Sequence, residues 1–279
     1  MQALDAGLAT LLRRDRLTVA AALITVTLLA WAYLLWLAAD MATSMNTGAM
    51  SGDMAGMDMS GMAGAIAPAI RTWAPADFAF MFAMWAVMMV GMMTPSVAPM
   101  VLLYAGVGRN ASESGTPFAS TGWFFAGYLA VWIAFSALAT CAQWALTILA
   151  LLTPMMATAS TILGGIVLVA VGLYQWTPLK QTCLRSCQAP LAFLMAHGGF
   201  SDTPLGAVRL GIAHGGYCLG CCFALMALLF VGGIMNVLWI AGLTILVLLE
   251  KIVASGRLIP RISGALIGAA GIWLLVHGG

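Results

Sequence analysis

The composition of this 279-residue chain excludes a soluble globular protein, because 63% of its residues are hydrophobic and only 7% are charged. A net charge of +2, with no basic stripe in the sequence, excludes nucleic acid as a partner. We therefore expect an all-α, polytopic integral membrane protein, surrounded by membrane lipid.

Seven apolar stretches are long enough to cross the hydrocarbon core of a bilayer, about 30 Å, which takes roughly 20 helical residues. They are 18–38, 77–107, 120–151, 157–178, 206–232, 235–254 and 261–277. Lys and Arg mark the cytoplasmic side, and ten of the eleven basic residues share one side if residues 1–17 are cytoplasmic. The sequence thus predicts a retained first transmembrane helix at 18–38, a six-helix membrane domain over 77–279, and an external C-terminus.

The segment between the first two spans, 39–76, is poor in large apolar side chains but rich in methionine. Thioethers are soft ligands that suit Cu(I), and in a solvated loop they have nothing to pack against. We expect an external loop that captures copper, although a linker without a metal role is the alternative. The candidate capture residues are Met50, Met54, Met57, Met59 and Met62.

The second span carries methionines at helical spacing. They form one stripe of Met81, Met84, Met88 and Met92, and beside it Met89 and Met93. Pro95 and Pro99 are expected to break this helix near its centre, since proline removes a backbone donor. Broken helices often mark the binding site of a transporter, but a methionine stripe is also common in adaptable core packing. Both interpretations of the stripe stay open.

A thiol-rich run lies inside the fifth span. Its candidate metal ligands are His214, Cys218, Cys221 and Cys222. Their spacing of three and four residues places all four side chains on one side of a helix, and thiolate with imidazole suits a soft metal. Cys183 and Cys187, four residues apart, predict a second pair of free thiols at the cytoplasmic mouth.

Four further expectations concern the rest of the chain. Residues 190–202 are apolar but too short to span, so we expect a short interfacial or re-entrant helix there. Tyr128 is expected at the membrane interface, and Gln143 in a hydrogen bond between helices. At the inner end of the sixth span, Glu250 needs a partner if it is buried, whereas Lys251 is expected to extend its amino group to the membrane surface.

These motifs resemble a bacterial family of predicted metal-binding integral membrane proteins, a domain of unknown function. The resemblance covers roughly 77–255 and leaves out the methionine-rich loop. It rests on the Met-Met and Thr-Pro run at 88–95, the run from Tyr174 to Lys180, Cys183 and Cys187, the run from His214 to Cys222, Met226, Asn236 and Glu250-Lys251. It implies a bacterial integral membrane protein. Together with the placement of Lys and Arg, it leads us to expect the bacterial inner membrane, with a cytoplasmic N-terminus and a periplasmic C-terminus.

The leading hypothesis is a non-enzymatic protein that binds Cu(I) in the membrane and either transports it or delivers it to a cuproenzyme. A copper chaperone is a further candidate partner, and zinc is kept as an alternative metal. A transmembrane thiol–disulfide oxidoreductase is the runner-up, because Cys218 and Cys221 form a Cys-x-x-Cys motif. A structural or assembly subunit without metal is the third hypothesis. The sequence leaves the oligomeric state open.

Overall fold

The computed structural model describes residues 2–50, 73–113, 119–152, 157–253 and 257–278. The helices are α1 (Gln2–Met50), α2 (Pro75–Glu113), α3 (Thr121–Ile148), α4 (Thr161–Tyr174), α5 (Pro178–Gln188), α6 (Pro190–Ala196), α7 (Pro204–Ala227), α8 (Leu229–Gly232), α9 (Val237–Ile252) and α10 (Leu258–His277). This confirms the all-α prediction. Within the described ranges, β structure is limited to one isolated bridge, between Leu152 and Thr158.

Within the described ranges, five helical segments are long and apolar enough to cross a membrane: Leu17–Met41 of α1, α2, α3, α7 with α8, and α10. A sixth is added if α4 and α5, which meet at an angle of 64°, count as one broken span. The remaining candidate, α9, has 16 residues. The expected count of seven therefore stays a prediction.

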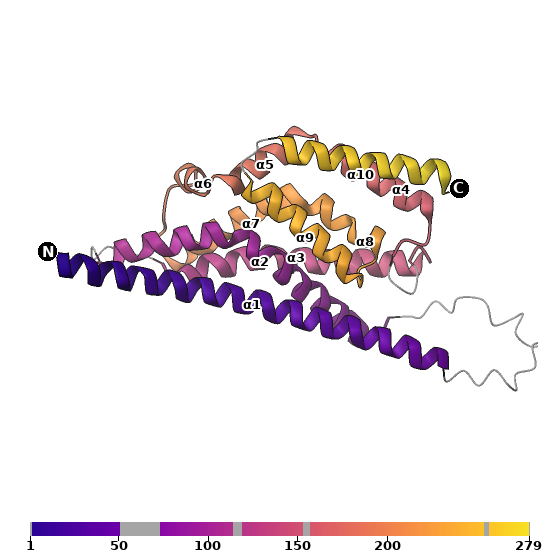
Figure 1. Cartoon of the computed structure of the whole chain (residues 1–279), viewed down its shortest axis with the longest axis horizontal. Helices are drawn as coiled ribbons and strands as arrows, with labels where there is room; N and C mark the ends of the chain where they lie inside the picture. Colours follow the sequence, from indigo (N-terminus) through magenta and orange to yellow (C-terminus); the bar gives the residue numbers. More distant parts are fainter. Residues whose placement is uncertain (1, 51–72, 114–118, 153–156, 254–256, 279) are drawn as a thin grey trace, which may run out of the picture.

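The long helices run back and forth along one axis, so that α1 begins and α10 ends at opposite ends of the bundle (Figure 1). Helices α7 and α9 lie between the α1–α2 side and the α4–α10 side (Figure 1). The elements that carry the cysteines and the buried charges are thereby placed in the interior of the molecule.

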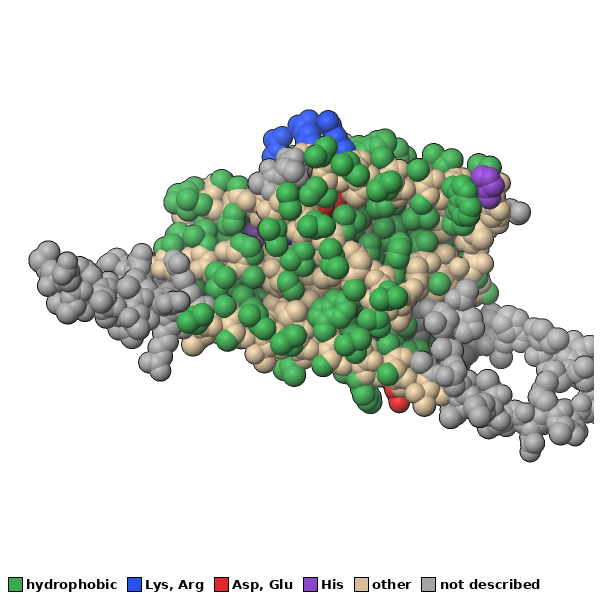
Figure 2. All heavy atoms as spheres, viewed as in Figure 1, with side chains coloured by type: hydrophobic (Ala, Val, Ile, Leu, Met, Phe, Trp, Pro, Cys, Tyr) green, Lys and Arg blue, Asp and Glu red, His purple; other side chains and the backbone are tan. Residues whose placement is uncertain are grey.

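The outer surface is dominated by large apolar side chains, which cover most of the face in Figure 2. Leu238 is 85% exposed, and Leu138, Leu266 and Val276 are each about two-thirds exposed. A water-soluble monomer rarely exposes apolar patches of this extent. Lipid is the environment that such a surface fits.

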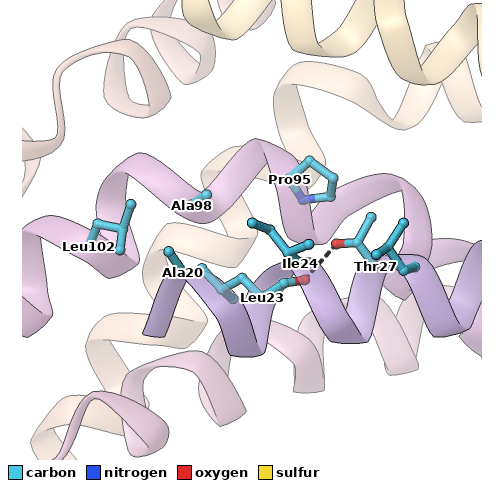
Figure 3. Close-up of a pocket in the computed structure, with 8 residues that line it drawn as sticks. Ala20, Leu23, Ile24, Thr27, Pro95, Ala98 and Leu102 are labelled. Atoms are coloured by element: carbon cyan, nitrogen blue, oxygen red, sulfur yellow. Dashed lines mark hydrogen bonds between the residues drawn. The ribbon is translucent and has the colours of Figure 1, made fainter. Parts of the chain in front are cut away.

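Helix α2 differs from the expectation of a broken helix, because it continues from Pro75 to Glu113 with Pro95 and Pro99 inside it. Near the prolines, the Met93 carbonyl accepts hydrogen bonds from the Ser96 hydroxyl at 2.8 Å and the Tyr128 hydroxyl at 3.2 Å. These two contacts hold the segment around Pro95 to α3. The carbonyls that the prolines leave without a helical donor are those of Gly91 and Pro95, four residues before each proline. Pro95 also lines an apolar groove of about 390 Å³ between α1 and α2, shown with its lining residues in Figure 3.

Helix α1 is longer than the predicted membrane helix at 18–38 and continues to Met50. The first part of the predicted methionine-rich loop is therefore helical. The expected short helix at 190–202 is present as α6, which ends at Ala196 and is followed by a turn. Its place relative to a membrane surface stays a prediction.

Local sequence signals fix the starts of the helices that carry cysteines. The Thr177 side chain accepts the backbone N–H of Lys180 at the start of α5, and the Thr203 side chain accepts that of Gly206 at the start of α7. Each threonine is followed by a proline at the first helical position. This combination is a strong helix start, because the cap satisfies a free donor and proline needs none.

Glycines bring the interior helices into close contact. A side chain on Gly127 of α3 or Gly211 of α7 would collide with a backbone carbonyl of the facing helix. Gly172 of α4 meets the Gly264 carbonyl of α10 in the same way. Small residues permit such close approach in membrane helices. The α3–α7 contact is important for the site, because it sets Tyr128 beside Cys218.

Candidate metal site

The site is centred on the thiol of Cys218, in the middle of α7. Its Sγ lies 2.8 Å from Lys251 Nζ of α9 and 3.1 Å from the Tyr128 hydroxyl of α3. Cys218 and Tyr128 are almost completely buried, and Lys251 is 7% exposed. A buried sulfur with an amino group and a hydroxyl at these distances is well placed to carry negative charge as a thiolate.

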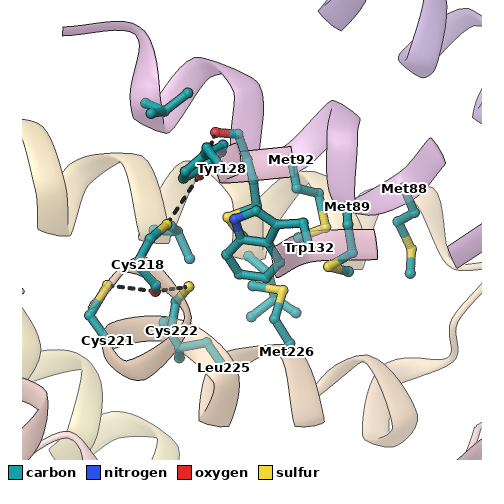
Figure 4. Close-up of a cluster of buried hydrophobic side chains, with 14 of the residues drawn as sticks. Met88, Met89, Met92, Tyr128, Trp132, Cys218, Cys221, Cys222, Leu225 and Met226 are labelled. Atoms are coloured by element: carbon teal, nitrogen blue, oxygen red, sulfur yellow. Dashed lines mark hydrogen bonds between the residues drawn. The ribbon is translucent and has the colours of Figure 1, made fainter. Parts of the chain in front are cut away.

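The two neighbouring cysteines point to the same turn of α7. The Cys221 and Cys222 thiols both donate to the Cys218 carbonyl, at 3.1 and 2.9 Å (Figure 4). Both side chains are about 1% exposed. The prediction that these cysteines share one side of a helix is consistent with this arrangement.

Helix α5 adds two more thiols to this group, which sequence reasoning had placed in a separate pair. The Cys187 side chain interacts with those of Cys218 and Cys221. The Cys183 thiol packs against Gly220, where an added side chain would collide with it. We call the five residues Cys183, Cys187, Cys218, Cys221 and Cys222 the thiol cluster; all five are free thiols.

His214, one turn before Cys218, lies in an aromatic pocket. Its ring centroid is 5.0 Å from that of Phe193 and 6.0 Å from those of Phe124 and Tyr128. The side chain is 3% exposed, and its Nδ1 atom has no hydrogen-bond partner among the described residues. Burying a ring nitrogen without a hydrogen-bond partner costs free energy, so this imidazole is a candidate additional metal ligand beside the thiol cluster.

The methionines of α2 are buried as the spacing predicted. Met84, Met88, Met89, Met92 and Met93 are each at most 1% exposed, whereas Met81 is partly buried. Figure 4 shows the rings of Tyr128 and Trp132 between Met88, Met89 and Met92 of α2 and the cysteines of α7. The thioethers and thiols therefore form two adjacent sets, separated by aromatic rings.

Ser96 connects these two sets. Its Oγ lies 4.0 Å from the Met93 sulfur and accepts a hydrogen bond of 3.0 Å from Lys251 Nζ. Lys251 in turn contacts the Cys218 thiol. A chain of polar contacts thus runs from the methionine helix to the thiol cluster.

Gln143 of α3 contacts the other end of the stripe. Its amide nitrogen donates a hydrogen bond to the Met81 sulfur, and its amide oxygen accepts one from the Trp85 ring. Gln143 thus links α3 to α2, which confirms the expected hydrogen bond between helices.

Two expectations about polar residues are wrong. Tyr128 is completely buried beside Cys218 rather than at the membrane interface, and Lys251 turns inward instead of reaching the surface. From the sequence alone, a lysine at the end of an apolar helix is expected to anchor that helix at the membrane surface. Only the packing of α9 against α2 and α7 decides the direction of its side chain.

Glu250, next to Lys251, has the partner that its burial requires. Its carboxylate lies 2.7 Å from Lys180 Nζ of α5, and the two side chains are 2% and 1% exposed. The same carboxylate accepts hydrogen bonds from Gln175 at 3.0 Å and Ser263 at 3.3 Å. This network ties α4, α5 and α10 to α9, and it thereby holds the cysteines of α5 in place.

The remaining candidates lie away from the cluster. Met50 ends α1, and the other predicted capture residues, Met54, Met57, Met59 and Met62, lie outside the described residues. His197, directly after α6, stacks on Phe193 of that helix with ring centroids 4.2 Å apart. Cys141 is exposed on α3.

No three or more His, Cys, Asp or Glu side chains in the described part of the chain are arranged to hold a metal ion. Within these residues, the thiol cluster therefore offers a pair of sulfur ligands and not a set of three or four. Cu(I) forms stable complexes with two thiolates, whereas structural zinc sites use four ligands in a tetrahedron. The donor chemistry therefore fits Cu(I) better than zinc.

Comparison with known families agrees with this chemistry. A family model described as "PpoB2: Copper chaperone" matches residues 82–274. The chain belongs to this family. No curated protein and no solved structure matches the chain.

The PpoB2 match includes the thiol cluster, His214, Lys251 and five of the six candidate methionines of α2, Met84, Met88, Met89, Met92 and Met93. It leaves out Met81, α1 and the methionine-rich segment, of which the resemblance noted from the motifs had left out the last two. The family description connects the chain with copper, and the membrane setting rests on the apolar helices.

Proposed function

We propose that this protein binds Cu(I) at the thiol cluster inside the bacterial inner membrane and delivers it to a membrane cuproenzyme. The observation that carries the proposal is the Cys218 thiol, buried between Lys251 and Tyr128 and surrounded by four further thiols, in a chain of the copper chaperone family. The cargo is the metal itself, so the protein acts as a carrier and not as an enzyme.

The cysteines and the methionines have different roles in this proposal, because their sulfur atoms differ in softness and charge. Cys218 and a second thiol of the cluster bind the metal as thiolates, which are strong soft ligands. The methionines of α2 offer weaker, neutral sulfur ligands that exchange faster. Because the two sets are adjacent, we infer that copper passes between the methionine stripe and the thiol cluster during loading or release.

Delivery to a protein is favoured over transport across the membrane by the family description. The two are separated by reconstituting the protein into vesicles that contain a Cu(I) indicator and adding Cu(I) outside. A carrier that hands copper to a partner retains the metal in the bilayer, and the indicator stays unchanged. Copper-dependent signal in the lumen above that of protein-free vesicles would identify a transporter instead.

The metal assignment is tested by copper analysis of protein purified without oxygen. We expect stoichiometric Cu(I) in the wild type and its loss in the double variant Cys218→Ser/Cys222→Ser. Cys141→Ser is the matched control, because that thiol is exposed on α3 and does not belong to the cluster. Wild-type copper content in the double variant would show that the thiols of α7 are not the ligands.

A further inference from the structure

In the part of the chain that the structure describes, Lys251 is the cationic group in direct contact with a candidate ligand. Its amino group donates to the Cys218 sulfur at 2.8 Å and to the Ser96 hydroxyl at 3.0 Å. Among the described residues it forms no ion pair with a carboxylate, because neighbouring Glu250 pairs with Lys180 instead. Its positive charge is therefore directed to the sulfur atoms.

The surroundings make this charge important. Lys251 is 7% exposed, and Cys218, Cys221 and Cys222 are each about 1% exposed. In such a poorly polarisable interior, an uncompensated charge is expensive, and interactions between charges are far stronger than in water. A metal complex that leaves the site electrically neutral is favoured over one that does not.

The charges distinguish monovalent from divalent metals. Two thiolates and one monovalent ion form a complex of charge −1, which the Lys251 ammonium neutralises. The same two thiolates and a divalent ion form a neutral complex, so the ammonium leaves a net charge of +1 and also repels the entering ion. Both metals can be equally soft, so sulfur ligands alone do not make this distinction.

We propose that Lys251 is the residue that makes the thiol cluster selective for monovalent soft cations over divalent ones. This deepens the proposed function, since it concerns the same site. It assigns to Lys251 a role in specificity through charge, without requiring the lysine to bind the metal.

The test uses Ag(I) and Cd(II), two soft ions of different charge that do not change oxidation state. Binding of each ion to the purified full-length protein is measured in competition with a calibrated chelator, for the wild type, Lys251→Leu and Lys251→Arg. Leucine removes the charge without adding a sulfur atom that could itself bind a soft ion, and arginine keeps the charge. Arg209→Leu is the control, because Arg209 is an exposed cation on the same helix as Cys218.

We expect Lys251→Leu to lower the ratio of Ag(I) to Cd(II) affinity at least tenfold, about 1.4 kcal/mol. Lys251→Arg should keep the ratio within about threefold, and Arg209→Leu should leave it unchanged. An equal loss of both ions in Lys251→Leu would show a structural role only and overturn the inference. An unchanged ratio with normal binding would overturn it as well. If the wild type binds neither ion at the thiols, the proposed function fails first, and the selectivity role falls with it.

Discussion

The buried pair of Lys180 and Glu250 leads to a quantitative prediction about stability. Replacing Lys180 with Met removes the ammonium 2.7 Å from the Glu250 carboxylate, in a place where both side chains are at most 2% exposed. An exposed ion pair contributes about 0–1 kcal/mol, but breaking a buried pair by removing one partner costs about 3–5 kcal/mol. The donors from Gln175 and Ser263 remain and stabilise the carboxylate in part. We therefore expect a loss of about 3 kcal/mol, near the lower end.

The assay is denaturant unfolding of the purified protein in detergent, followed by tryptophan fluorescence and by helical circular dichroism. The second variant is Lys180→Met/Glu250→Gln, in which the unpaired charge is gone while the Gln175 amide still meets an oxygen. This double variant should unfold within about 1 kcal/mol of the wild type, since replacing both partners avoids the buried charge. A Lys180→Met variant as stable as the wild type would refute the reasoning. A double variant no more stable than Lys180→Met would do the same.

Three further predictions concern the site. The double variant Met88→Leu/Met92→Leu conserves side-chain volume, so it should unfold like the wild type. Its copper loading, measured by stopped-flow competition, should be at least severalfold slower. An unchanged loading rate would show that the stripe serves only as core packing. Cys218 and Cys221 should stay reduced in cells, as measured by alkylation and mass spectrometry, whereas a trapped disulfide between them would favour the oxidoreductase hypothesis. The variant Gly211→Leu should separate α3 from α7. It should lower the free energy of unfolding by about 2 kcal/mol or more, and it should lower the copper content as well. An unchanged unfolding midpoint would show that the contact between the two helices adapts.

The sequence was sufficient for the helical fold, because apolar length and helical spacing are local properties. It placed Cys218, Cys221 and Cys222 together for the same reason. It failed where partners come from distant segments. The addition of Cys187 to the cluster depends on how α5 turns back after Pro178, and the inward direction of Lys251 depends on tertiary packing.

The proline expectation failed for a different reason. Pro95 and Pro99 do remove backbone donors, but α2 stays continuous because a membrane helix with tertiary partners tolerates proline. The hydroxyls of Ser96 and Tyr128, which meet the Met93 carbonyl beside Pro95, add contacts within α2 and to α3.

The adjacency of Glu250 and Lys251 limits how α9 can move. Consecutive side chains leave the axis of an α-helix about 100° apart. The two residues therefore hold α9 from two directions, Glu250 through Lys180 of α5 and Lys251 through Cys218 of α7. Rotation of α9 about its own axis would break both contacts at once, whereas a tilt about its C-terminal end would preserve them. If metal loading displaces α9, the N-terminal end near Val237 should swing while the turn at Glu250 and Lys251 acts as the pivot.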